Sequence, residues 1–407
     1  MLKKQIIIST TIFCISIFAI PLNAQRIASI YSMFGVGRLS DNSYGVNRAL
    51  GGTGIAFQSG RSLNYLNPAS YLGILPNSIN MEFGIYGIYN RSDNGSISQS
   101  DGDININYFS TNLYINNNCA LSLGIVPYSS IDYEVHSDNE VGGDLTSYKK
   151  IFKGTGGLSR GYLGSSYKIC KGLVAGINAS YILGPITQTE TAVSNDNFTG
   201  YELKNERIAH SIYLDYGLQY SINQREWLYT LGLIFGPGKT LSTIDNLEYT
   251  YNDIYTVLEQ ENQTELKIPQ NIGLGIAVKK GSIFRAGFDY EWKKWSNINF
   301  SNPNFDTKNS HRFSIGMEYS PTHRDSWFRN FAYRLGANYK NSYLKINNTP
   351  INSMAINCGL GIPLTKEGML NLSLEYGEEG TLNNGLIKSN YWMLCMNISL
   401  FEFWANL

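Results

Sequence analysis

Apolar and polar residues alternate with a period of two along most of the chain after residue 78. This period indicates β-strands with two different faces, because successive side chains of a strand point to opposite sides. In the segment 284–292, for example, aromatic and aliphatic residues alternate with Arg285, Asp289 and Glu291. We expect about fourteen such strands, each near the ~10 residues that a tilted membrane strand needs. They lie near 79–90, 104–116, 119–127, 157–168, 172–183, 207–221, 226–236, 269–279, 282–292, 310–320, 329–341, 352–362, 369–377 and 390–401.

The connections between these segments alternate in length. Those at 91–103, 128–156, 184–206, 237–268 and 293–309 are long, whereas those at 117–118, 169–171, 222–225 and 280–281 are short. Outer-membrane barrels have an even number of strands, with short periplasmic turns and longer external loops. A soluble β-sandwich gives no reason for this alternation. The sequence therefore predicts an all-β fold, a transmembrane antiparallel β-barrel of about 14 strands.

The composition excludes two other classes of protein. Lys+Arg 32 balances Asp+Glu 32, so the chain lacks the basic footprint of a nucleic-acid-binding protein. A mean hydropathy of −0.19 argues against a helical membrane protein. It does not argue against a barrel, because the apolar residues of the lipid face and the polar residues of the lumen face cancel in the average. Only 16% of the residues are charged, against about 25% in a typical globular domain. One nearly charge-free face explains this, and the 29 tyrosines suit interfacial girdles.

The last expected strand continues into aromatic residues. Its apolar stripe is Trp392, Leu394, Met396, Ile398 and Leu400. We expect this stripe to face lipid, and Phe401, Phe403 and Trp404 to form a girdle at the periplasmic interface.

The first residues have the layout of an export signal. A basic start at 1–4 precedes the apolar run 6–20, and a cut is expected between Ala24 and Gln25. A membrane anchor is the alternative, but the apolar run is shorter than the ~18 residues that a spanning helix needs. We therefore expect a signal peptide at 1–24, a plug at 25–78 and a barrel at 79–407, located in the outer membrane of a Gram-negative-type bacterium.

Residues 25–78 do not alternate and are rich in glycine. Barrels wider than eight strands leave a lumen that is open or plugged, and about fifty residues are enough for a plug. A flexible periplasmic arm is the alternative. We favour the plug, because aromatic residues such as Tyr31, Phe34 and Tyr65 would be poorly placed in a solvated arm.

Two motifs in this segment point to a family. Gly51-Gly52-Thr53-Gly54-Ile55-Ala56 leads into Tyr65-Leu66-Asn67-Pro68-Ala69, and together they look like the N-terminal hatch of FadL-type outer-membrane transporters. The stretch 288–296 is similar to a later strand pair of that family. The resemblance implies a fourteen-stranded barrel with a hatch, whose motif residues are Gly51, Gly52, Gly54, Asn67, Pro68 and Ala69. It also implies passive uptake of hydrophobic small molecules, such as long-chain fatty acids, through the hatch and a lateral opening.

The chain departs from the uptake pattern in one outer loop. Transporters of this family present apolar loop tips to capture ligand, whereas loop 184–206 is polar. Loop 237–268 is the better candidate for capture, through Leu241, Ile244, Leu247, Ile254, Val257 and Leu258. Some relatives serve as non-transporting partners in secretion machinery, so a structural or secretion-associated barrel remains the alternative.

Charged residues on the expected lumen face form a candidate network. Its members are Arg285, Asp289, Glu291, Arg312, Glu318, Arg334 and Glu375. Strands 282–292 and 310–320 run antiparallel, so Arg285 should lie near Glu318 and Glu291 near Arg312. The alternative is that each charge meets lumen water.

The sequence shows no recognisable grouping of catalytic or metal-binding residues. The four histidines lack metal-ligand spacing, and Asp138, Glu140 and Asp144 match no known calcium loop. We therefore expect no enzyme activity, cofactor or metal.

Cys119 and Cys170 fall at one rim of neighbouring strands, where a disulfide is possible but free thiols are the simpler interpretation. The expected partners are outer-membrane lipids, a hydrophobic small-molecule ligand and an envelope protein, but no nucleic acid.

Overall fold

The chain folds into a closed antiparallel β-barrel of 14 strands, as the alternation predicts. The computed structural model describes residues 29–140, 147–194, 200–251, 254–258, 265–296, 298, 305–321 and 330–403. The expected signal peptide at 1–24 and Trp404 lie outside these residues. The barrel closes where β2 (Ser78–Asp93) pairs with β22 (Lys388–Phe403) over their whole lengths.

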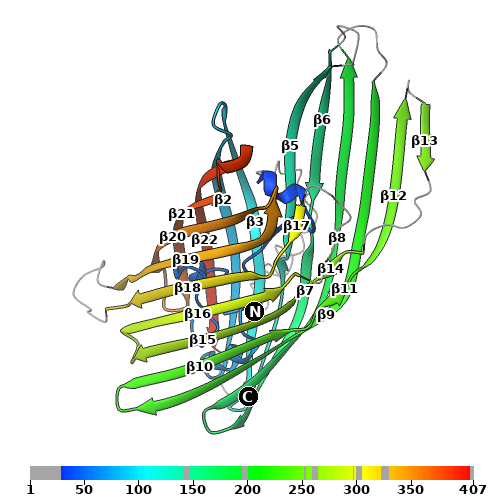
Figure 1. Cartoon of the computed structure of the whole chain (residues 1–407). Helices are drawn as coiled ribbons and strands as arrows, with labels where there is room; N and C mark the ends of the chain where they lie inside the picture. The colour runs from blue at the N-terminus through cyan, green and yellow to red at the C-terminus, as the bar shows by residue number, and fades with distance from the viewer. Residues whose placement is uncertain are drawn as a thin grey trace, which may run out of the picture.

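Twelve further strands complete the wall, each paired with the next (Figure 1). They are β3 (Ser98–Asn116), β4 (Cys119–Pro127), β7 (Ser159–Cys170), β8 (Leu173–Ser194), β9 (Tyr201–Gln224), β10 (Trp227–Gly236), β15 (Gln270–Lys280), β16 (Phe284–Lys294), β18 (Ser310–Tyr319), β19 (Ala332–Ile346), β20 (Thr349–Pro363) and β21 (Gly368–Gly380). Further strands pair with the extended ends of these: β5 (Ser129–Glu140) with β6 (Ser147–Gly156) and β6 with β8, β12 (Ser242–Tyr251) with β9 and with β13 (Ile254–Leu258), and β17 (Phe305–Thr307) with β19. The short strands β11 (Lys239–Thr240) and β14 (Lys267–Ile268) pair with each other, and η4 (Asn383–Gly385) connects β21 to β22.

The two faces of the wall differ as expected for a membrane barrel. On β22, Trp392 and Leu394 point outward and are half exposed, whereas Asn397 and Ser399 point inward and are buried. Phe401 also points inward and is buried, so its prediction as part of a lipid-side girdle is wrong. The pleat explains this result, because an odd-numbered residue of β22 shares the face of Asn397 and Ser399.

One side of the barrel rises well above the rest (Figure 1). This tall end is built from β5, β6, β8, β9, β12 and β13, which occupy most of the segments predicted as loops at 128–156, 184–206 and 237–268. Cross-strand ion pairs fasten these extensions, among them Lys150–Glu190 at 2.7 Å and Arg207–Asp245 at 2.7 Å. Both faces carry polar residues there, so the apolar alternation that marks a membrane strand is missing.

The opposite end carries short turns, such as those between β9 and β10 and between β15 and β16. The alternation of long and short connections does not continue to the C-terminus. At the short-turn end, β18 ends at Tyr319 and β19 begins only at Ala332, whereas β19 and β20 are joined at the other end by Asn347 and Asn348 alone. Both asparagines have positive φ (47° and 65°), as a two-residue hairpin turn with the twist of its strands requires.

The N-terminal segment, defined here as residues 29–77, lies inside the barrel. It contains η1 (Ile30–Met33), β1 (Arg38–Leu39), α2 (Val46–Ala49) and η2 (Pro68–Gly73). Most of its apolar side chains are buried against the wall, including Tyr71 and Leu50, which have no measurable exposure. Across the described residues, no helix is both long and apolar enough to cross a membrane.

Candidate functional site

The contact between the N-terminal segment and the inner wall is the candidate site. It begins with Asn67, whose side-chain oxygen accepts a bond from Ala69 N (3.0 Å) and so caps η2, with Pro68 in its first turn. The Asn67 amide also donates to Ile55 O (2.8 Å) and to Leu218 O of β9 (3.2 Å). The Asn-Pro-Ala motif thus forms a local cap and a bond to the barrel at the same time.

Two wall carboxylates bind the backbone of the segment directly. Asp289 Oδ2 on β16 accepts from Gly54 N (2.6 Å) and Ile55 N (2.9 Å). Glu82 Oε1 on β2 accepts from Leu63 N (2.7 Å), and its other oxygen accepts from the Tyr108 hydroxyl (2.8 Å). Both carboxylates are almost fully buried. They replace the ladder partners that these backbone amides would have in a sheet.

Arg312 on β18 holds the glycine turn of the segment. Its Nη2 donates to Gly51 O (3.2 Å), and its Nη1 lies 3.9 Å from Glu291 Oε2. Gly52 has φ +79°, and a β-carbon there would collide with the Arg312 guanidinium. The turn therefore needs glycine for its conformation and for the space that the guanidinium fills.

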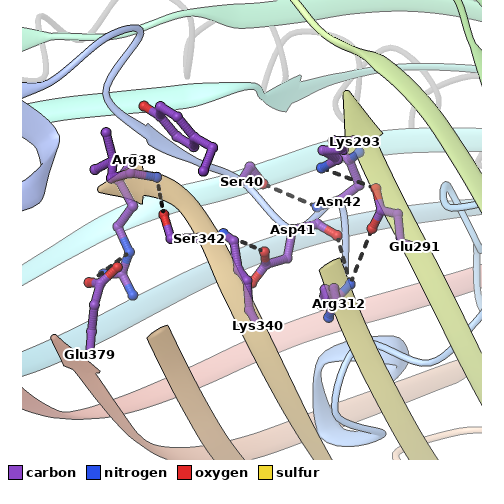
Figure 2. A network of polar contacts seen from close by, with 12 residues as sticks. Arg38, Ser40, Asp41, Asn42, Glu291, Lys293, Arg312, Lys340, Ser342 and Glu379 are labelled. Atoms are coloured by element: carbon purple, nitrogen blue, oxygen red, sulfur yellow. Dashed lines mark hydrogen bonds and ion pairs between the residues drawn. The ribbon is translucent and has the colours of Figure 1, made fainter. Parts of the chain in front are cut away.

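Further ion pairs surround Asp41, as Figure 2 shows. Asp41 Oδ1 lies 3.3 Å from Lys340 Nζ, and Arg312 Nη1 donates to Asp41 O (3.5 Å). Nearby, Lys293 pairs with Glu291 at 3.0 Å, and Arg38 lies 3.8 Å from Glu379. Burial opposes ionisation of Asp41, yet Lys340 and the neighbouring cations hold the pKa of its carboxyl well below the usual range.

The other predicted network residues lie in two groups. Arg285 Nη2 and Arg334 Nε both bind Glu318 Oε2, at 2.9 and 2.6 Å, near the short-turn end. Glu375 Oε2 pairs with Arg48 of α2 at 3.3 Å, and its other oxygen accepts from the Tyr391 hydroxyl (2.9 Å). The predicted charges thus form several clusters, most of which contact the N-terminal segment.

Glycines of the inner wall lie against the N-terminal segment at many of their contacts. A β-carbon at Gly232 would collide with Ile55 O, and one at Gly336 would collide with the backbone at Leu50 and Gly51. Two of these positions, Gly176 and Gly217, face each other across a ladder, as do Gly316 and Gly336. We name the set the glycine belt: Gly164, Gly176, Gly217, Gly232, Gly275, Gly287, Gly316, Gly336 and Gly359. The belt lets backbone pack directly against backbone.

The half of the lumen toward the tall end is filled by an apolar cluster. Phe34 and Val36 of the segment are buried there with wall residues. Trp295 and Tyr343 stack at 4.0 Å between ring centroids, and the Tyr343 hydroxyl donates to Phe34 O (3.2 Å). β1 adds a short ladder to β5. The segment is therefore bound at every level of the lumen that it occupies.

The residues predicted to capture ligand do not form one apolar tip. They lie on β12, β13 and the preceding residue rather than in a loop. Leu241 is buried in the apolar cluster, whereas Ile244 and Ile254 are exposed on the tall end. Leu247 is half-buried, and its Cα pairs with that of Leu258, while Val257 pairs with Glu248.

Three cavities bear on function. One of about 1070 Å³ opens at the short-turn end, bounded by Phe57 to Ser62 and the wall. A second, of about 50 Å³, lies beside the middle of β9. There β9 stops pairing with β12 at His210 and starts pairing with β10 at Tyr216. A third, of about 450 Å³, is on the outer, lipid-facing surface around Ile315, Ala337 and Ile356.

Several site residues were not identified from the sequence. Glu82, Gln219, which donates to Ile55 O (3.0 Å), and Lys340 stand at inward positions of strands that alternate, so the period of two could have identified them. Asp41 and Arg48 carried no such signal, because the N-terminal segment has no period. Among the described residues, no group of His, Cys, Asp and Glu could hold a metal ion. Cys119 and Cys170 are both free thiols.

Comparisons with known proteins agree with this architecture. A family model described as BamG matches residues 1–406. No curated protein matches the chain.

Several solved structures resemble the barrel. The CymD monoaromatic hydrocarbon channel has a TM-score of 0.60 at 14% identity, covering 92% of this chain and 100% of that one. The toluene transporter TbuX of Ralstonia pickettii has a TM-score of 0.60 at 14% identity (89% and 99% covered). A FadL homologue of Pseudomonas aeruginosa has a TM-score of 0.59 at 12% identity (90% and 99% covered). The fold is that of FadL-type channels for hydrophobic compounds.

Proposed function

The chain belongs to the BamG family, and from that premise we propose that it is an outer-membrane barrel with a lumen that stays closed. In this proposal the barrel is a structural subunit that binds another protein of the cell envelope. The N-terminal segment acts as its permanent plug. The short-turn end faces the periplasm and the tall end faces outward, as in other outer-membrane barrels. Residues 1–24 are the export signal. The subunit needs no cofactor and performs no catalysis.

The way the N-terminal segment is held carries this proposal. Asp289 and Glu82 bind its backbone, and at the glycine belt the segment lies so close that a β-carbon on the wall would collide with it or with its contact residues. Withdrawing the segment would strand these buried carboxylates without partners, at a cost of several kcal/mol. Such a contact suits a fixed plug better than a moving gate.

The cavities also support a closed barrel. A passage for hydrophobic molecules should be lined mainly by apolar side chains. The cavity of about 1070 Å³ is instead lined by several cations, including Arg61 and Lys366. The apolar cavity of about 450 Å³ is on the outer wall, where it is open to lipid rather than to the lumen.

Uptake of hydrophobic small molecules is the second candidate. The break in the ladder between β9 and β10 favours it, because the small cavity there is lined from both faces of the wall, by Tyr216 outside and Tyr213 inside. Its volume of about 50 Å³ has room for only a few water molecules. Arg160 and Asp215 also line it, so uptake would require this region to open and its charges to move.

Conductance and uptake measurements distinguish the two candidates. We expect the wild-type protein in planar bilayers to show no steady conductance, and proteoliposomes to take up a fluorescent fatty acid or toluene no faster than protein-free liposomes. The Asp289→Ala/Arg312→Ala variant removes two anchors of the plug and should show intermittent conductance, which verifies that the assay detects an open barrel.

A partner is tested by purification from native membranes. The tagged wild-type protein should retain an envelope protein in fixed stoichiometry through size-exclusion chromatography. Saturable uptake by the wild-type protein, together with loss of every partner under mild detergent, would overturn the proposal in favour of transport.

A further inference from the structure

The large cavity at the short-turn end has an excess of positive charge. Its floor is the loop of the N-terminal segment from Ala56 to Ser62, and its walls are the ends of β10, β15, β16, β18 and β19. Among the residues that the structure describes, five cationic side chains line it, Arg61, Lys279, Arg285, Arg334 and Lys366, against one carboxylate, Glu318. This described lining carries a formal charge of 5 − 1 = +4.

The single carboxylate is already shared. Arg285 and Arg334 both bind Glu318 Oε2, at 2.9 and 2.6 Å. In the part of the chain that the structure describes, no ion pair joins Arg61, Lys279 or Lys366 to an acidic side chain. Arg285 Nε is buried and has no hydrogen-bond partner among those residues. Within the described residues, the cavity thus has more cations than carboxylates to neutralise them.

A concave wall strengthens the field of these cations. Charges of one sign around a cleft with low-dielectric walls focus the potential and attract a ligand of opposite sign. The volume of about 1070 Å³ is at the upper end of the range for drug-sized ligands, so it exceeds what a single small anion needs. Several side chains of a peptide would fit.

The floor is shaped for an extended chain. Gly60 has φ +108°, and a β-carbon there would meet nothing within 4 Å, so the loop presents open backbone to the cavity. Gln58 Nε2 donates to Ser221 Oγ on β9 (3.1 Å), which fixes the loop against the wall. Arg61 itself is exposed and free to reach a bound chain.

From this charge and shape we propose that the cavity docks an acidic, extended peptide segment of a periplasmic protein. Carboxylates of the segment pair with Arg61, Lys279 and Lys366, while its backbone lies along Gln58 to Ser62. The inference rests on the proposed function, because it names the chemistry of the partner at the periplasmic end of a closed barrel.

Binding of a defined peptide tests the inference on the full-length protein in nanodiscs. The probe is a fluorescent peptide rich in Asp and Glu, and its control is the same peptide with Asn and Gln. We expect anisotropy to show binding of the acidic peptide only, weakening with added salt. The Arg61→Gln/Lys366→Gln variant should bind about tenfold more weakly, because two partly exposed ion pairs are lost.

Lys171→Gln is the matched control, since Lys171 is exposed in the short turn between β7 and β8 and does not line the cavity. It should bind like the wild type, and all variants should keep the wild-type melting temperature. Equal binding of the neutral peptide, or unchanged binding by the double variant, would overturn the inference. Displacement by equimolar inorganic phosphate would also overturn it, by reducing the cavity to a simple anion site. These outcomes leave the conductance and uptake results untouched, so failure of this inference is distinct from failure of the proposed function.

Discussion

The carboxylate of Asp289 lies 2.6 Å from the backbone nitrogen of Gly54, and it accepts a second bond from Ile55 N at 2.9 Å. A residue of the barrel wall thus satisfies two backbone amides of a stretch that pairs with no strand. Buried backbone amides need such partners, because leaving them unpaired is costly. Asp289 is therefore a direct link between the wall and the N-terminal segment.

Removing this acceptor should loosen the plug. We expect Asp289→Ala to destabilise it by roughly 3 kcal/mol, since two buried amides lose the acceptor that they share. Asp289→Asn keeps one acceptor oxygen and should cost about half as much. The readout is the rate of trypsin cleavage after Arg48, followed by mass spectrometry. Asp101→Asn, at an exposed position of β3, serves as the control and should leave the rate unchanged.

The glycine belt predicts a second effect. Gly336→Ala places a β-carbon against the backbone at Leu50 and Gly51, so it should destabilise the protein by about 1–3 kcal/mol through overpacking. Gly161→Ala, where nothing lies within 4 Å, should have little effect. Thermal unfolding followed by circular dichroism in detergent measures both. Similar melting temperatures for the two variants would contradict a close fit of the plug.

Asp41 gives a pH dependence. Burial opposes its charge, but Lys340 and its neighbours hold the pKa of Asp41 well below its usual range. An acid with a lowered pKa contributes stability above its unfolded pKa of about 3.9, and that contribution fades as pH falls. The stability difference between wild type and Asp41→Asn should therefore be constant from about pH 8 to 5 and shrink below about pH 4. Melting temperatures at each pH give the difference; one that shrinks near neutrality would show that Asp41 is not ionised as described.

The strands and their register could be predicted because lipid and lumen impose different chemistry on alternate residues. Arg285 pairs with Glu318, and Glu291 with Arg312, as the antiparallel register requires. The period of two carries this information wherever one face of the strand meets lipid. The same signal disappears above the membrane, where Lys150 and Glu190 belong to strands that are polar on both faces.

The plug contacts could not be predicted in the same way. Arg48 meets Glu375 and Asp41 meets Lys340 across about 300 residues of chain. No local period fixes such pairs. The alternation predicts that Gly232 and Gly336 face the lumen, but small residues there are compatible with an open lumen as well as a filled one. The structure shows that the lumen is filled at these positions, because Ile55 lies against Gly232 and Gly51 against Gly336.

Glu318 predicts an asymmetry between two substitutions. Glu318→Gln leaves Arg285 and Arg334 facing each other without their shared carboxylate, and Arg334 is almost fully buried. Breaking a buried pair in this way typically costs 3–5 kcal/mol, so we expect a loss of about that size. Arg285→Gln leaves Glu318 paired with Arg334 and should cost only about 1 kcal/mol. Urea unfolding in detergent measures each variant.

The double variant Arg285→Gln/Glu318→Gln tests the reason for this asymmetry. It removes the carboxylate and one of the two cations, so the repulsion between Arg285 and Arg334 is gone. Its cost should fall below the sum of the two single costs by at least about 1 kcal/mol. Strict additivity would show that the two arginines do not interact through Glu318, and equal costs for the two single variants would show that the carboxylate is not shared.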